Sequence, residues 1–187
     1  MSREPTDTIL IKHMLTGDEQ AFDQLYSRYK NTVYFYLNAR CSDALMINDI
    51  FQDTWETVLR RCNDYTDSGN FKAWLLTIAR SRLIDYYRKQ PQRAVHLEFD
   101  ENTVDDTALS DSDITLTEKL VDLKCETDQL IAFMSRLPVP QQEAFSLYAV
   151  GLSVTEIADM TGVNKETAKS RVRYARAKLL QQMQNSQ

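Results

Sequence analysis

The chain has 187 residues, of which 43% are hydrophobic and 26% charged, and its formal net charge is −5. This length accommodates one ordinary domain or two small ones, and the composition is that of a globular protein with a core. No apolar run reaches the roughly 18 residues of a membrane span, and no apolar segment of a signal peptide follows the N-terminus. We therefore expect a cytoplasmic protein without direct membrane insertion.

The few cysteines and histidines argue against redox and metal chemistry. Cys41, Cys62 and Cys125 are odd in number and far apart, so neither a disulfide framework nor a CxxC site fits them. His13 and His96 have no neighbours at metal-ligand spacing. Reduced thiols are the simplest interpretation, and the sequence predicts no metal site and no cofactor.

The negative charge is concentrated in one segment of the chain. Residues 1–95 have a net charge of +1, residues 96–128 of −9, and residues 129–187 of +3. Because the acidity belongs to the middle segment, both flanks remain able to approach the phosphates of a nucleic acid.

Helices should dominate, because only four glycines and four prolines are present and no stretch alternates with period two. The first helix is predicted from Thr6 to Leu15, with Gly17 at its C-terminal end. Asp18 can cap the second helix. The apolar stripe of that helix consists of Phe22, Leu25, Tyr26, Tyr29, Val33 and Tyr36.

Two more helices complete a predicted first domain over residues 1–95. A polar loop at residues 63–70 separates them, and the second runs from Phe71 to about Lys89, stopping before Pro91. Periodicity places Leu75, Ile78 and Ala79 of that helix in the core. The stripe of the preceding helix consists of Ile47, Ile50, Phe51, Trp55, Val58, Leu59 and Cys62.

The segment of residues 96–128 is predicted to be an acidic linker that runs into the first helix of the next domain. Its first part, residues 96–112, has few large apolar side chains and many acids, a composition that favours a linker over a packed element. Helical periodicity returns near Leu116.

A second small domain is predicted over residues 129–187. Pro138 and Pro140 interrupt its periodicity, so a helix is expected from Gln141 to Val150, ending at Gly151. Two further helices follow, which makes the fold class all-α with two small helical domains.

The last two helices have the spacing of a helix-turn-helix. Ser153 and Glu156 form a capping box, Gly162 provides the positive φ of a tight turn, and Asn164 caps the second helix. The pattern alone also fits an ordinary helical hairpin or many repressors. In a helix-turn-helix the second helix enters the major groove, and its outward residues are Lys165, Thr167, Lys169, Ser170, Arg171, Arg173 and Arg176.

Motifs in both halves resemble those of sigma factors of bacterial RNA polymerase. The resemblance covers about residues 10–90 and 128–182, without a region 3 domain between them, which is the layout of the extracytoplasmic-function (ECF) group. Region 2 is matched by the motifs at residues 49–55, 71–80 and 85–88, and region 4 by those at 137–138, 151–153, 156–158 and 167–172.

The resemblance implies an alternative sigma factor and not an enzyme. Its partners would be core RNA polymerase (through the β′ coiled coil and the β flap), promoter DNA and an anti-sigma factor. The first domain would bind the polymerase and open the −10 element, and the second would read the −35 element.

Four residues of the third predicted helix share one face. From periodicity alone, such a charged face is most simply a solvated one. The resemblance instead implies that it docks on the basic β′ coiled coil, where charge complementarity would give fast and oriented association. The residues are Asp49, Gln52, Asp53 and Glu56.

The fourth helix and the loop before it mix aromatic and basic side chains, which suits single-stranded DNA. The resemblance implies that they open the −10 element and hold a flipped base, whose extrusion costs a few kcal/mol. Trp74 fits the core equally well. The predicted −10 contacts are Tyr65, Ser68, Asn70, Phe71, Lys72, Trp74, Arg80 and Arg88.

Departures from the family pattern at Asn164, at the Lys165–Glu166 pair and at Ala168 leave the preferred −35 sequence open. The acidic linker is either a solubilising tether or, as the resemblance suggests, a segment that occupies the RNA exit channel of the polymerase.

Two rival hypotheses belong to other functional classes. A stand-alone helix-turn-helix regulator would explain the C-terminal motif but not the region 2 motifs. An enzyme with a metal bound by Asp49, Asp53, Asp64 and Asp67 would lack a histidine or phosphate-binding loop to complete its site.

Overall fold

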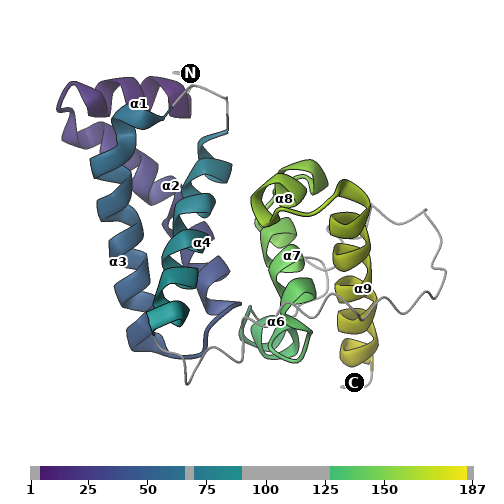
Figure 1. Cartoon of the computed structure of the whole chain (residues 1–187). Coiled ribbons are helices and arrows are strands. Elements are labelled where there is room, and N and C mark those ends of the chain that lie inside the picture. The colour runs from purple at the N-terminus through teal and green to yellow at the C-terminus, as the bar shows by residue number, and fades with distance from the viewer. Residues whose placement is uncertain (1–4, 66–69, 90–126, 185–187) are drawn as a thin grey trace. The chain divides into compact units, whose positions relative to one another are not determined.

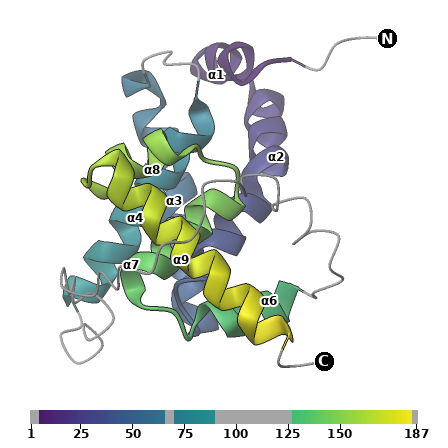
Figure 2. The same cartoon turned by 90° about the vertical axis from the view of Figure 1, so that its right-hand side faces the viewer.

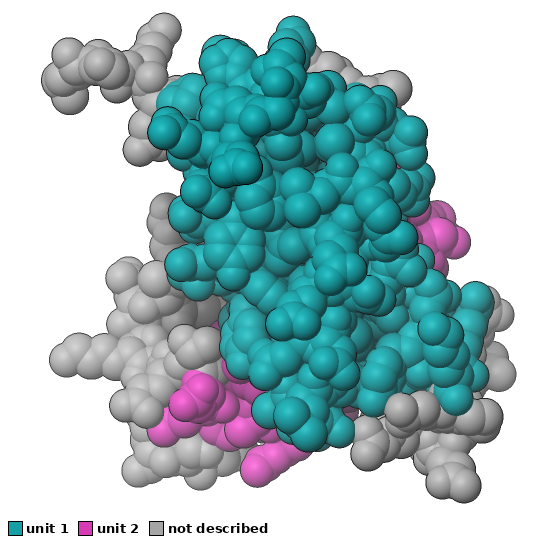
Figure 3. All heavy atoms as spheres, turned by 90° about the vertical axis from the view of Figure 1, so that its left-hand side faces the viewer, with its two compact units in different colours: residues 1–91 teal, residues 92–187 magenta. Residues whose placement is uncertain are grey.

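The computed structural model describes residues 5–65, 70–89 and 127–184, and all regular elements in these ranges are helices (Figure 1). The chain divides into two compact units, residues 1–91 and residues 92–187, which are coloured teal and magenta in Figure 3. The predicted all-α fold class is confirmed. The predicted linker lies outside the described residues as far as position 126.

The first unit is a bundle of α-helices. Helices α3 and α4 run antiparallel, and α1 lies across the end of the bundle where α3 ends and α4 begins (Figure 1). The elements are α1 (Asp7–Leu15), α2 (Glu19–Asn38), α3 (Ala44–Arg61), the 3-10 helix η1 (Cys62–Asp64) and α4 (Phe71–Lys89).

Local hydrogen bonds explain where these helices begin and end. The Asp18 carboxylate accepts hydrogen bonds from the backbone N–H groups of Gln20 (3.0 Å) and Ala21 (3.3 Å), as predicted for the cap of α2. Gly17 has a φ of +89°, which a residue with a side chain rarely adopts. Asp43 caps α3 in the same way as Asp18 caps α2, a cap that was not predicted.

The core of the first unit is formed mainly by the apolar stripes of its helices. The predicted burial of Leu75, Ile78 and Ala79 is confirmed. The prediction is wrong for Leu59, which is 48% exposed. Thr54 and Thr57 of the same helix are buried, and their hydroxyls donate to backbone carbonyls four residues back in α3.

The second unit consists of four α-helices in the described residues. Helix α9 packs along α7 and also contacts α8 and α6 (Figure 2). Among the described helices of both units, none is long and apolar enough to cross a bilayer. The elements are α6 (Thr127–Met134), α7 (Val139–Ala149), α8 (Val154–Thr161) and α9 (Lys165–Gln184).

Helix α7 begins two residues earlier than predicted. Pro140 lies in its first turn, where the missing N–H removes no helical hydrogen bond. The N–H groups of Gln141 and Gln142 both bond to the Pro138 carbonyl, each at 2.9 Å. The helix ends at Ala149, one residue before the predicted end.

The predicted helix-turn-helix is confirmed in its local geometry. Ser153 and Glu156 form both hydrogen bonds of the capping box at the start of α8. Gly162 has a φ of +74°. The Asn164 side chain accepts a hydrogen bond from the Thr167 N–H at 2.7 Å and so caps α9. Small residues fill the contact between α8 and α9, with Ala158 at 5% and Ala168 at 0% exposure.

Candidate functional site

The four residues of α3 that the motif assigns to polymerase binding form one surface, which we call the acidic face: Asp49, Gln52, Asp53 and Glu56. All four side chains are exposed. They line an open hollow of about 530 Å³ between α3 and the last turns of α4. A partner would therefore meet the acidic face as one wall of a concave surface and not as an isolated helix.

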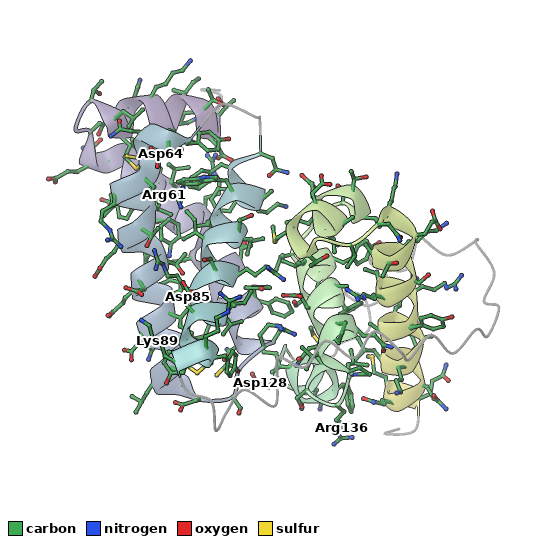
Figure 4. All side chains as sticks on the ribbon, in the orientation of Figure 1. Arg61, Asp64, Asp85, Lys89, Asp128 and Arg136 are labelled. Atoms are coloured by element: carbon green, nitrogen blue, oxygen red, sulfur yellow. The ribbon has the colours of Figure 1, made fainter. Side chains whose placement is uncertain are left out.

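The opposite wall of this hollow comes from α4 and was not predicted. Arg82, Asp85, Tyr86, Arg88 and Lys89 line it, and Figure 4 labels Asp85 and Lys89 near the end of the helix. Arg88, predicted as a −10 contact, thus lies beside the acidic face. The spacing of residues 82, 85, 86 and 89 on one helical face was the available signal.

The aspartates of the metal hypothesis do not gather. Asp64 lies in η1, 11 residues after Asp53 and outside the helix that carries Asp49 and Asp53. Its carboxylate pairs with Arg61 at 3.3 Å (Figure 4). Asp67 lies outside the described residues. Within the described ranges, no three His, Cys, Asp or Glu residues are grouped so that they could hold a metal.

The predicted −10 aromatics form an aromatic cluster of Tyr29, Tyr65, Phe71 and Trp74. The Tyr65 ring centroid lies 5.3 Å from that of Trp74 and 5.8 Å from that of Phe71, both in edge contacts. Phe71 and Trp74 are 5.7 Å apart, and Tyr29 of α2 is 5.4 Å from Phe71. These separations are those of favourable aromatic pairs. The motif did not indicate Tyr29.

The members of the aromatic cluster differ in how far they are buried. Phe71 is only 1% exposed, because α4 begins at this residue and its ring is directed against α2. The prediction that Phe71 itself contacts DNA is therefore not supported in this conformation. Trp74 and Tyr65 are half-buried, so part of each remains accessible to solvent.

The remaining predicted −10 residues have mixed environments. The Asn70 side chain accepts a hydrogen bond from the Ala73 N–H at 3.1 Å and so caps α4, which is a structural role that the motif did not indicate. Lys72 and Arg80 are partly exposed. Ser68 lies outside the described residues.

The predicted −35 residues of α9 differ in exposure. Lys165 is exposed, whereas the other six predicted −35 residues are half-buried. Arg173 stacks over the Tyr174 ring at 5.2 Å, which holds its guanidinium near the helix. The buried line of α9 consists of Ala168, Val172, Ala175 and Leu179.

Arg171 and Arg176 flank this buried line on opposite sides. They are five residues apart, so at about 100° per residue they point about 140° apart around the helix axis. The Nη2 atom of Arg176 is itself buried. A duplex that meets α9 on one side therefore cannot contact both arginines in the same way.

Comparisons with known proteins find relatives for both helical units. Residues 25–93 match the family model of sigma-70 region 2, and residues 127–179 match that of sigma-70 region 4. The RNA polymerase sigma factor NccH of Alcaligenes xylosoxydans is 28% identical over the full length of both chains. The ECF sigma factor BldN of Streptomyces coelicolor is 31% identical over 86% of this chain and 60% of its own length.

Two solved structures share the fold. The sigma factor CnrH, in complex with the cytosolic domain of CnrY, has a TM-score of 0.66 at 23% identity over 97% of this chain and 99% of its own. RpoE of Bartonella quintana, in complex with the anti-sigma factor NepR, has a TM-score of 0.65 at 22% identity over 87% and 96%. The chain belongs to the sigma-70 family of transcription-initiation factors, in its extracytoplasmic-function group. A stand-alone helix-turn-helix regulator would not explain the region 2 match.

Proposed function

We propose that this sigma factor binds core RNA polymerase, directs it to promoters with matching −35 and −10 elements, and opens the DNA without catalytic activity of its own. The observation that carries this proposal is the ordered match of residues 25–93 to region 2 and of residues 127–179 to region 4. One module supports polymerase binding and DNA opening, and the other supports duplex reading.

The acidic face is the proposed polymerase-binding surface. Its four side chains are exposed and line one side of a hollow, so a basic helix could contact them together. Opposite charges across an interface increase the association rate and orient the partners, and this contribution weakens as salt screens the charges.

The aromatic cluster is the proposed support for a base of the opened −10 element. Tyr65 and Trp74 each remain partly accessible, and stacking on an aromatic side chain stabilises a single-stranded base by about 1–3 kcal/mol. That is comparable with the few kcal/mol needed to extrude a base from a duplex. Lys72 and Arg80 could pair with the phosphates alongside.

Helix α9 is the proposed reader of the −35 element. The cap at Asn164 sets the start of the helix, and the first residues of a recognition helix reach base edges. Lys165, Thr167 and Lys169 lie in these first turns. The β flap of the polymerase is a further proposed contact of this sigma factor.

An anti-sigma factor is a further proposed partner. RpoE of Bartonella quintana was solved in complex with the anti-sigma factor NepR, and the described part of this chain has the same fold. The acidic linker is proposed to occupy the RNA exit channel, although it lies outside the described residues.

Run-off transcription with purified core polymerase tests the proposed function. The expected result is specific initiation from a cognate promoter, found by selection from a promoter library, only when both proteins are present. The protein alone should bind duplex DNA weakly, because residues 129–187 have a net charge of only +3. Nanomolar operator binding without any association with polymerase would contradict the proposal.

A further inference from the structure

One carboxylate joins α1 to α2. Asp7 is the first residue of α1, and its two carboxylate oxygens accept hydrogen bonds from the Arg28 guanidinium and the Tyr29 hydroxyl. Arg28 also donates to the Pro5 carbonyl at 3.0 Å. The Asp7 side chain is only 23% exposed, so this junction is partly shielded from solvent.

The same Tyr29 is part of the aromatic cluster. Its ring contacts Phe71, and the Phe71 ring in turn contacts both Tyr65 and Trp74. Burial, and next the hydrogen bond to Asp7, raise the pKa of the Tyr29 hydroxyl well above its ordinary value. Tyr29 is thus linked to Asp7 through its hydroxyl and to Phe71 through its ring.

Helix α1 also contacts the element that precedes Tyr65 in the chain. It contacts η1, and Tyr65 follows η1 directly in the chain. Figure 1 shows α1 across the end of the bundle at which α3 ends and α4 begins. Asp7 lies outside residues 25–93, the part that matches the region 2 model, so the matched segment by itself does not contain this support.

We propose that Asp7 is a positioning residue for promoter opening: through Tyr29 it holds Phe71, on which the half-exposed rings of Tyr65 and Trp74 rest. This inference depends on the proposed role of the aromatic cluster in opening the −10 element. A preorganised stacking surface lowers the ordering cost of capturing a base. Loss of the Asp7 contact leaves the rings in place on average but less restrained, so opening slows while binding of core polymerase is unchanged.

The test uses the full-length protein in holoenzyme with three variants: Asp7→Ala, Tyr29→Phe and the double variant. Leu10 and Ile11 are 2% and 4% exposed, so α1 remains docked when Asp7 is changed. Asp18→Ala is the matched control, because it removes a carboxylate of the same unit that caps α2 by accepting from the Gln20 and Ala21 N–H groups.

The measurement is the rate of open-complex formation on a duplex promoter and on the same promoter with a pre-opened −10 bubble. We expect Asp7→Ala and Tyr29→Phe each to slow opening of the duplex about tenfold, a factor that a hydrogen bond to a charged group can supply. The double variant should be no slower than either single variant, and the bubble, which removes the cost of separating the strands, should partly restore the rate. Affinity for core polymerase should be unchanged.

Three results would overturn the inference. One is equal slowing by Asp7→Ala and Asp18→Ala, which would indicate general destabilisation. Another is slowing by Asp7→Ala without slowing by Tyr29→Phe, which would exclude transmission through the hydroxyl. The third is wild-type opening by both variants. If the wild-type holoenzyme itself failed to initiate, the proposed function would be wrong, and that result is distinguishable from all three.

Discussion

Reversal of one charge on the acidic face should separate polymerase binding from folding. Asp53 is exposed on α3, and its backbone carbonyl, not its side chain, accepts the Thr57 hydroxyl. Asp53→Arg therefore removes no buried contact. The new guanidinium would lie across the hollow from Arg82, Arg88 and Lys89. Repulsion between such hydrated charges is about 1 kcal/mol or less, and exposed substitutions act within about 0.5 kcal/mol, so the free energy of unfolding should change by less than about 1 kcal/mol.

The effect on polymerase binding should be much larger. Disruption of one charge of a desolvated interfacial pair costs about 2–5 kcal/mol, which corresponds to a roughly 30-fold to several-thousand-fold weaker Kd. The assay is titration of labelled sigma factor with core polymerase at several salt concentrations, combined with thermal unfolding of the free protein. The wild-type affinity should fall with salt more steeply than that of the variant.

Asp23→Arg provides the matched control. Asp23 is an exposed aspartate of α2 in the same unit, outside the lining of the hollow, and the substitution makes the same change in net charge. It should leave affinity nearly unchanged. Wild-type affinity for Asp53→Arg, or equal weakening by both variants, would refute a specific role for the acidic face.

Four other substitutions test the remaining surfaces and the start of α9. Trp74→Ala should lower the free energy of unfolding by about 1–3 kcal/mol, because the ring is half-buried with two aromatic neighbours, each worth about 0.5–1.5 kcal/mol. A pre-opened bubble should partly restore initiation by this variant. A loss of about 4 kcal/mol or more, the size expected for a fully buried ring, would assign Trp74 to the core. Arg171→Ala should relax preference at one or two −35 positions by about 1–3 kcal/mol, whereas Arg176→Ala should weaken all promoters alike and flatten their salt dependence. Transcription from a promoter library at two salt concentrations checks both, and the opposite pattern would mean that α9 docks by its other edge. Asn164→Ala should destabilise the second unit by about 1 kcal/mol through loss of the Thr167 N–H bond, measurable by chemical denaturation; unchanged stability would show that solvent caps α9 equally well.

Helix ends were largely predictable because the chemistry that sets them is local. Asp18, Ser153 and Asn164 each bond to a backbone N–H two or three residues away, so residue type and spacing are sufficient. The effect of Pro140 was predicted wrongly, because residue type and spacing alone do not decide it. Proline ends a helix in most positions but is compatible with the first turn, and the distinction depends on where the chain enters the helix.

The acidic face also follows from spacing alone, since residues three and four apart lie on one side of any helix. Its surroundings do not follow. Arg82, Asp85 and Lys89 face it only because α4 packs antiparallel to α3, and that depends on how apolar stripes interlock across the bundle. Leu59 was predicted to be buried but is exposed, because the helical period of apolar residues identifies the apolar stripe of α3 but not where that stripe ends around the helix.

The sequence by itself determined the helical class, the two modules and the surfaces that carry charge, because these properties depend on neighbours within about one helical turn. The tertiary structure decided which side chains support one another over long separations. Asp7 and Tyr29 are 22 residues apart, and Phe71 meets Tyr29 only after α4 has docked on α2. The energy of such contacts arises from burial against a particular partner, and no local pattern specifies that partner.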